Sequence, residues 1–92
     1  MNVEYQKAAN GEEAYNTAKE QITPEYVQKF GVKADVDFDD SGKKISATGK
    51  GFTLNLVFYD NHCKVDLDLS FMLRPFKGKV LEGIESKLKR HV

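Results

Sequence analysis

The chain has 92 residues, with 14 Lys and Arg residues against 14 Asp and Glu residues, and a single cysteine. A chain of this length forms one core, so we expect a single domain over residues 1–92. The balanced charge argues against a nucleic-acid partner, because proteins that bind phosphate backbones usually carry a basic excess.

Two further features of the sequence bear on the cellular compartment of the protein. One cysteine cannot form an internal disulfide, which agrees with a reducing compartment. No segment approaches the ~20 apolar residues of a membrane span, and the N-terminus lacks the apolar block of a signal peptide. We therefore expect a cytoplasmic protein without a membrane span.

The N-terminal third of the chain predicts a helix after an irregular start. Residues 1–9 show no clear period, so we expect either a disordered or frayed lead-in or a short extra strand. Asn10 or Gly11 can cap a helix, and the acidic pair Glu12 and Glu13 suits the positive end of the helix dipole. A narrow apolar stripe with a spacing of four follows and comprises Ala14, Ala18 and Ile22.

The Thr23–Pro24 step interrupts this helical pattern. Proline lacks an N–H group and clashes with the preceding turn, but it also suits the first position of a new helix that Thr23 would cap. We therefore expect either a kinked helix or two short helices, ending at Gly31 as a C-terminal cap. The side chains expected to face the core from the second half are Tyr26, Val27 and Phe30.

From Val32 the apolar spacing changes to two, which predicts strands. The predicted strands cover residues 32–38, 43–48, 52–59 and 63–71. The turns between them are short, and Gly42 is expected to take the positive φ that the first turn requires. Short turns join antiparallel neighbours, because parallel strands need long crossovers, so we expect a four-stranded antiparallel meander.

The last strand leads almost directly into the last helix. Apolar residues alternate with polar ones along this strand at Val65, Leu67, Leu69 and Phe71. After Pro75 the apolar spacing becomes helical, at Phe76, Val80, Leu81, Ile84 and Leu88. The fold class that we expect is α+β in two layers: helix, four-stranded antiparallel meander, helix, with both helices on one sheet face. Phe52 and Phe71 are expected in the core.

The residues that could carry chemistry form no recognisable site. His62, in a predicted turn, and His91, near the end of the chain, have no partners at metal-ligand spacing. Cys63 begins a strand and is expected to be a small core residue rather than a nucleophile. Asp66 and Asp68 fall on the polar sheet face, where no burial separates their pKa values. We therefore expect no catalytic residues, no metal site and no cofactor, and hence no enzyme.

Three segments give the chain a family resemblance. They are residues 26–32 (YVQKFGV), Gly51–Phe52 opening a strand, and residues 65–80 (VDLDLSFMLRPFKGKV), followed by Ile84 and Leu88. In these segments the chain resembles the polyhydroxyalkanoic acid system proteins, also called polyhydroxyalkanoate granule-region proteins, a family of small bacterial domains. Pro24 departs from the uninterrupted first helix expected of the family.

The resemblance implies a non-enzymatic accessory protein of polyester storage, either granule-associated or regulatory. Its implied partners are the polyester granule surface or granule proteins, and no catalytic residue set is carried over. The amphipathic last helix would offer an apolar contact surface, comprising Phe76, Val80, Leu81, Ile84 and Leu88. The same stripe is also what a helix packed on the sheet requires.

Two other functions remain open from the residues alone. One is a small-molecule or lipid carrier with a cavity between Phe30, Phe52, Phe58 and the last helix. The other is a dimerisation module that uses the polar sheet face or an exposed edge strand, so a homodimer is also considered.

Overall fold

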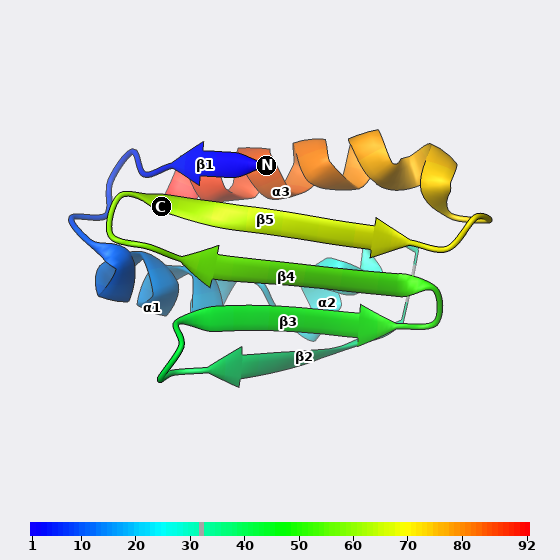
Figure 1. Ribbon diagram of the computed structural model, residues 1–92, viewed down its shortest axis with the longest axis horizontal. Helices are drawn as coiled ribbons and strands as arrows, with labels where there is room; N and C mark the ends of the chain where they lie inside the picture. The colour runs from blue at the N-terminus through cyan, green and yellow to red at the C-terminus, as the bar shows by residue number, and fades with distance from the viewer. Residues whose placement is uncertain (32) are drawn as a thin grey trace.

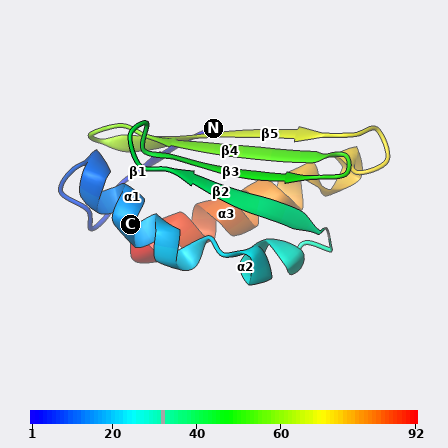
Figure 2. The ribbon, with the colours of Figure 1, turned by 90° about the horizontal axis from the view of Figure 1, so that it is seen from below.

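Five antiparallel strands form one sheet, and helices cover one of its faces. The computed structural model describes residues 1–31 and 33–92. In chain order the elements are β1 (Asn2–Glu4), α1 (Gly11–Gln21), α2 (Pro24–Gln28), β2 (Ala34–Asp39), β3 (Lys44–Gly49), β4 (Phe52–Phe58), β5 (His62–Leu69), the 3-10 helix η1 (Arg74–Phe76) and α3 (Lys77–His91). The strand order is β1-β5-β4-β3-β2, and α1, α2 and α3 lie on the same side (Figures 1 and 2). The predicted α+β class is confirmed.

Of the two alternatives for residues 1–9, the short extra strand is confirmed: β1 extends the sheet beyond β5, so the sheet has five strands and not the four of the predicted meander. Val3 pairs with Cys63, and the Val3 side chain is buried. The Met1 ammonium group donates a hydrogen bond to the Val65 carbonyl oxygen at 3.0 Å. A strand of three residues directs only one side chain inward, so it leaves no periodic signal in the sequence.

Of the two alternatives for the first helical region, the structure has two short helices. The Asn10 side chain accepts a hydrogen bond from the Glu13 N–H at 2.9 Å and caps α1. The Thr23 hydroxyl oxygen accepts one from the Tyr26 N–H at 3.2 Å and caps α2, with Pro24 in the first turn. Both caps satisfy N–H groups that a helix leaves unpaired, and both match the sequence prediction.

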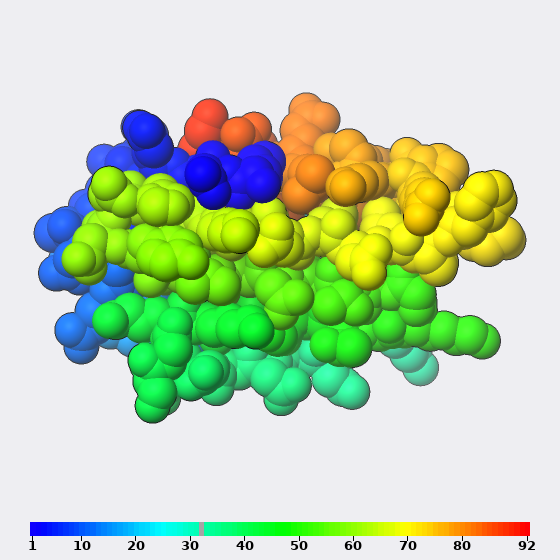
Figure 3. Space-filling model, viewed as in Figure 1, coloured from blue at the N-terminus to red at the C-terminus, as the bar shows by residue number. Residues whose placement is uncertain are grey.

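The core lies between the sheet and the three helices. Along β4 every second side chain is buried, at Phe52, Leu54, Leu56 and Phe58. Helix α1 contributes its small-residue stripe, and α3 contributes Val80, Ile84 and Leu88. The side chains on the opposite face of the sheet are mostly polar, and no helix covers that face (Figure 3).

The last strand ends two residues earlier than predicted. Leu69 pairs with Phe52, the first residue of β4. The Ser70 N–H then donates to the Gly51 carbonyl oxygen at 2.8 Å. Beyond this point β4 offers no further partner, so the chain turns away from the sheet. The prediction that Phe71 belongs to the core is therefore wrong, since its side chain is 82% exposed.

The turn between β2 and β3 also differs from the prediction in detail. Positive φ occurs at Lys43, with a value of 50°, and not at Gly42. The Gly42 N–H instead donates to the Asp39 carboxylate at 3.1 Å. A Cβ at Gly42 would lie 2.8 Å from that carboxylate, which is the end of an exposed side chain. The predicted strand residue Val32 lies outside the described residues.

Candidate apolar site at one end of the sheet

The segment that joins β5 to α3 carries a group of exposed apolar side chains. Phe71, Met72 and Phe76 are 82%, 80% and 53% exposed. This β5–α3 loop (residues 70–76) projects beyond the strands at one end of the molecule, coloured yellow in Figures 1 and 3. Scattered exposed apolar residues are ordinary, but a group of three on one short segment is typical of contact sites.

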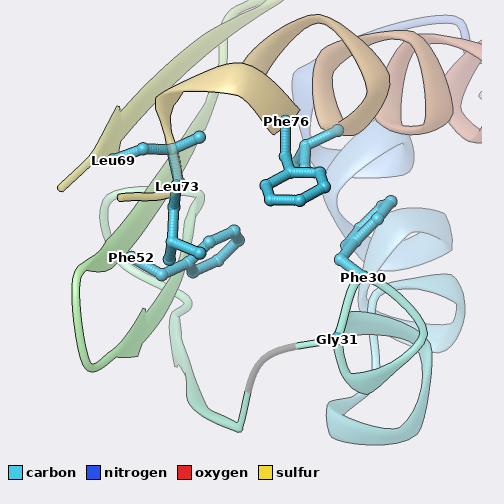
Figure 4. A pocket seen from close by; sticks show the side chains of 7 residues that line it. Phe30, Gly31, Phe52, Leu69, Leu73 and Phe76 are labelled. Atoms are coloured by element: carbon cyan, nitrogen blue, oxygen red, sulfur yellow. The ribbon is translucent and has the colours of Figure 1, made fainter. Parts of the chain in front are cut away.

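An apolar pocket of about 260 Å³ lies beside this loop. Its lining comes from the segment after α2, from strands β4 and β5, from the loop and from α3. It comprises Phe30, Gly31, Phe52, Leu69, Leu73, Phe76 and Val80. Figure 4 shows the rings of Phe30, Phe52 and Phe76 converging on the same space. We use the term apolar end for this pocket together with Phe71, Met72 and Phe76.

One wall of the pocket is held by contacts between α2 and α3. The Phe30 ring packs edge-on against Tyr26, with 5.4 Å between ring centroids. The Tyr26 hydroxyl donates to the Gly83 carbonyl oxygen of α3 at 3.1 Å. A Cβ at Gly83 would lie 3.0 Å from the Phe30 ring, so the absence of a side chain there makes room for it. Gly31 then turns the chain away with φ of 84°.

The other wall is held by the β3–β4 turn. Gly51 has φ of 71°, and a Cβ there would lie 2.6 Å from the Ser70 hydroxyl oxygen. The Ser70 carbonyl oxygen accepts hydrogen bonds from the N–H groups of Leu73 and Arg74, at 2.9 and 3.0 Å. These bonds fold the loop over the turn. Leu73 therefore lines the pocket, while Phe71 and Met72 remain outside.

Several exposed basic residues are next to lining residues in the chain. Immediate chain neighbours of lining residues include four exposed cations, which we call the basic rim: Lys29, Arg74, Lys77 and Lys79. The one acidic neighbour, Asp68, belongs to the opposite, polar face of the sheet, because strand residues alternate in direction. Within residues 1–31 and 33–92, ion pairs join Lys19 to Asp40 and Lys89 to Glu85, and none includes the basic rim.

The apolar stripe predicted as a contact surface is distributed between core and surface. Val80, Ile84 and Leu88 are buried under the sheet, and Leu81 is half-buried. Phe76 is the member that remains largely exposed, and it also lines the pocket. Sequence reasoning did not identify Phe71, Met72 and Leu73 as surface residues, although the run FMLRPF has four large apolar residues and no strand or helix period.

The cavity expected for a carrier is present only in part. Phe30 and Phe52 line the pocket together with residues of α3. Phe58 does not, because it lies at the other end of β4 and packs against Tyr15, with 6.0 Å between ring centroids.

The remaining candidate residues do not line this pocket. Cys63 is fully buried, and burial raises the pKa of its thiol to about 12, which removes the thiolate needed for nucleophilic chemistry. The His62 ring stacks on Tyr59 with 4.9 Å between centroids. Asp66 and Asp68 are exposed on the polar face. In the described part of the chain, no group of three or more His, Cys, Asp or Glu residues could hold a metal ion.

Comparison with known proteins gives one relationship. The model of the family described as "Putative polyhydroxyalkanoic acid system protein" matches residues 4–92. No curated protein and no solved structure matches the chain. Among the described helices, none has the length and apolar content needed to cross a membrane.

Proposed function

Because the chain belongs to the family of polyhydroxyalkanoic acid system proteins, we propose that it is a non-enzymatic accessory protein that attaches to polyester storage granules through its apolar end. The single observation that carries this proposal is the exposure of Phe71, Met72 and Phe76 on one short loop. A storage polyester presents an apolar interface, and the transfer of such side chains from water into it is favourable.

The size of this favourable transfer free energy predicts reversible attachment. Full burial of one large apolar side chain contributes roughly 1.5–3 kcal/mol, so the three residues together supply on the order of 5 kcal/mol. That value corresponds to a partition constant on the order of several thousand. A single acyl chain inserts into a membrane with similar strength and also detaches readily.

The basic rim is compatible with attachment through the apolar end. Long Lys and Arg side chains place their methylene groups against an apolar surface while their charges remain in water. Arg74, Lys77 and Lys79 lie within three residues of Phe76 in the chain and are exposed, so they are available for such contacts. Helix α3 keeps its buried stripe against the sheet throughout, because the attachment uses the loop before it.

Co-sedimentation with purified polyester granules tests this proposal. We expect the double variant Phe71→Ser/Met72→Ser to reduce the bound fraction at least tenfold while its melting temperature stays close to that of the wild type. The matched control is Phe38→Ser/Tyr59→Ser, which removes two exposed aromatic residues elsewhere, 42% and 47% exposed, and should bind within twofold of the wild type. Equal binding by all three proteins, or equal loss in both variants, would contradict attachment through the apolar end.

A further inference from the structure

We propose that the apolar pocket binds a single aliphatic chain of medium length that ends in a carboxylate. The chain occupies the space between Phe30, Phe52 and Phe76, and the carboxylate lies at the basic rim. This inference goes beyond granule attachment, since a soluble ligand would enter the pocket whether or not the loop contacts a granule.

The pocket selects an apolar ligand because its lining is apolar. The side chains around it are aromatic or aliphatic, and Gly31 adds backbone only. A polar group buried there would lose its hydrogen bonds to water without finding a partner, which disfavours sugars, nucleotides and peptides.

The volume limits the ligand to one chain. At about 260 Å³ the pocket lies just under the range of roughly 300–1,000 Å³ that is typical for drug-sized ligands. A sterol or a bundle of acyl chains does not fit that space. Lengthening the ligand should therefore strengthen binding only until the pocket is full.

The charge of the surroundings selects the end group. The basic rim places four exposed cations next to lining residues, against one acidic neighbour on the opposite face of the sheet. An anionic end group that remains in water at the mouth would interact favourably with them. Each exposed contact of this kind changes affinity by no more than about fivefold, so the chain supplies most of the affinity and the rim discriminates between end groups.

Titration calorimetry with straight-chain alkanoates of six to twelve carbons tests the pocket directly. We expect affinity to rise roughly fourfold with each added methylene group and then to level off within the series. The carboxylate should bind at least threefold more tightly than the alcohol of equal length at low salt, and this preference should shrink in high salt. A set of 3-hydroxyalkanoates distinguishes between two sources of the natural ligand. Tighter binding of 3-hydroxyalkanoates than of plain alkanoates identifies polyester-derived acids, and equal binding identifies fatty acids in general.

Two variants locate the binding to this pocket. Leu73→Trp places a large ring at a half-buried lining position and should reduce alkanoate affinity at least tenfold. Because the natural chain has no tryptophan, the emission of the introduced indole also reports whether the variant is folded. Replacing three of the four rim cations, in the variant Arg74→Gln/Lys77→Gln/Lys79→Gln, should remove most of the preference for the carboxylate over the alcohol. The control variant Lys64→Gln/Lys89→Gln/Arg90→Gln also removes three positive charges, but elsewhere on the surface. It should still bind the carboxylate more tightly than the alcohol.

Several outcomes would overturn the inference. They are an absence of binding heat with any alkanoate, equal affinity for acid and alcohol at low salt, and unchanged affinity in a folded Leu73→Trp variant. Dimerisation of the wild type that alkanoates do not disperse would also overturn it, because Phe71 and Met72 of a second copy would then be the occupant. The Phe71→Ser/Met72→Ser variant separates this proposal from granule attachment, since it should lose granule binding and retain the alkanoate.

Discussion

At the scale of single residues, Asp40 connects α1 to the turn between β2 and β3. Its carboxylate accepts hydrogen bonds from the Tyr15 hydroxyl at 2.6 Å and from the Lys19 ammonium group at 2.9 Å. These two donors hold the pKa of Asp40 below its usual range. Burial, and then the hydrogen bond to Asp40, raises the pKa of Tyr15 to about 12.

Asp40→Asn should lower stability at neutral pH and not in strong acid. A carboxyl group with a lowered pKa in the folded state stabilises the protein above its unfolded pKa, and this contribution is lost as pH falls through the folded value. The urea midpoint of the variant should therefore lie below that of the wild type at pH 7 and approach it in strong acid, where the carboxyl group is protonated in the folded protein as well. Asp37→Asn, on the polar sheet face, is the matched control and should show a smaller difference at pH 7. Identical pH profiles for wild type and Asp40→Asn would exclude this role.

Cys63 should react with thiol reagents only when the protein unfolds. Its side chain is fully buried, and burial raises the pKa of the thiol to about 12, so at pH 8 it is protonated and inaccessible. Labelling at pH 8 should follow the global unfolding curve in urea, whereas the unfolded chain should react at once. The raised pKa also implies stability that is fully present below the ordinary thiol pKa and is lost as pH rises above it. Rapid labelling of the native protein would contradict the packing of β5.

At the scale of elements, the sequence predicts those whose signals are local. The caps at Asn10 and Thr23 and the alternation along β4 depend on neighbours within a few residues, and each is found as predicted. Strand β1 depends on pairing with β5, about sixty positions later in the chain, and three residues carry no period of their own. Non-local pairing of this kind cannot be inferred from local patterns.

Phe71 illustrates a different failure of local reasoning. It continues the alternation of β5 by spacing alone, but Phe52, the first residue of the partner strand β4, already pairs with Leu69. The first two residues of the exposed loop, Ser70 and Phe71, were therefore assigned to the strand. Phe30, Phe52 and Phe76 were recognisable in advance as apolar residues near the last helix, whereas the role of Leu73 follows from how Ser70 and Gly51 fold the loop.

A comparison of two Phe→Ala variants tests this boundary of β5. Phe52 is 2% exposed, so Phe52→Ala should reduce the free energy of unfolding by roughly 3–5 kcal/mol. Phe71→Ala should change it by less than about 0.5 kcal/mol, because an exposed side chain makes few contacts to lose. Urea unfolding of both variants provides the measurement. Similar destabilisation by the two substitutions would place Phe71 in the core after all.

At the scale of the whole molecule, Val92 connects the end of α3 to the segment that joins β1 to α1. The Val92 carbonyl oxygen accepts hydrogen bonds from the N–H groups of Gln6, Lys7 and Ala8, at 3.1, 2.7 and 2.8 Å. The Val92 side chain is buried in the same core as β1 and α3. Unfolding of α3 would thus also release the segment that joins β1 to α1, which favours a single cooperative transition.

Two changes at Val92 should separate the contribution of its side chain from that of its backbone. Val92→Ala keeps the carbonyl acceptor and removes two buried methyl groups, so it should cost roughly 1–2 kcal/mol of unfolding free energy. Deletion of Val92 also leaves the N–H groups of residues 6–8 without their acceptor and should cost at least about 1 kcal/mol more. Hydrogen exchange provides the local readout: protection of the amides of Gln6, Lys7 and Ala8 should persist in Val92→Ala and disappear in the deletion variant. Equal stability and equal amide protection in the two variants would mean that the hydrogen bonds to Val92 do not hold the ends of the chain together.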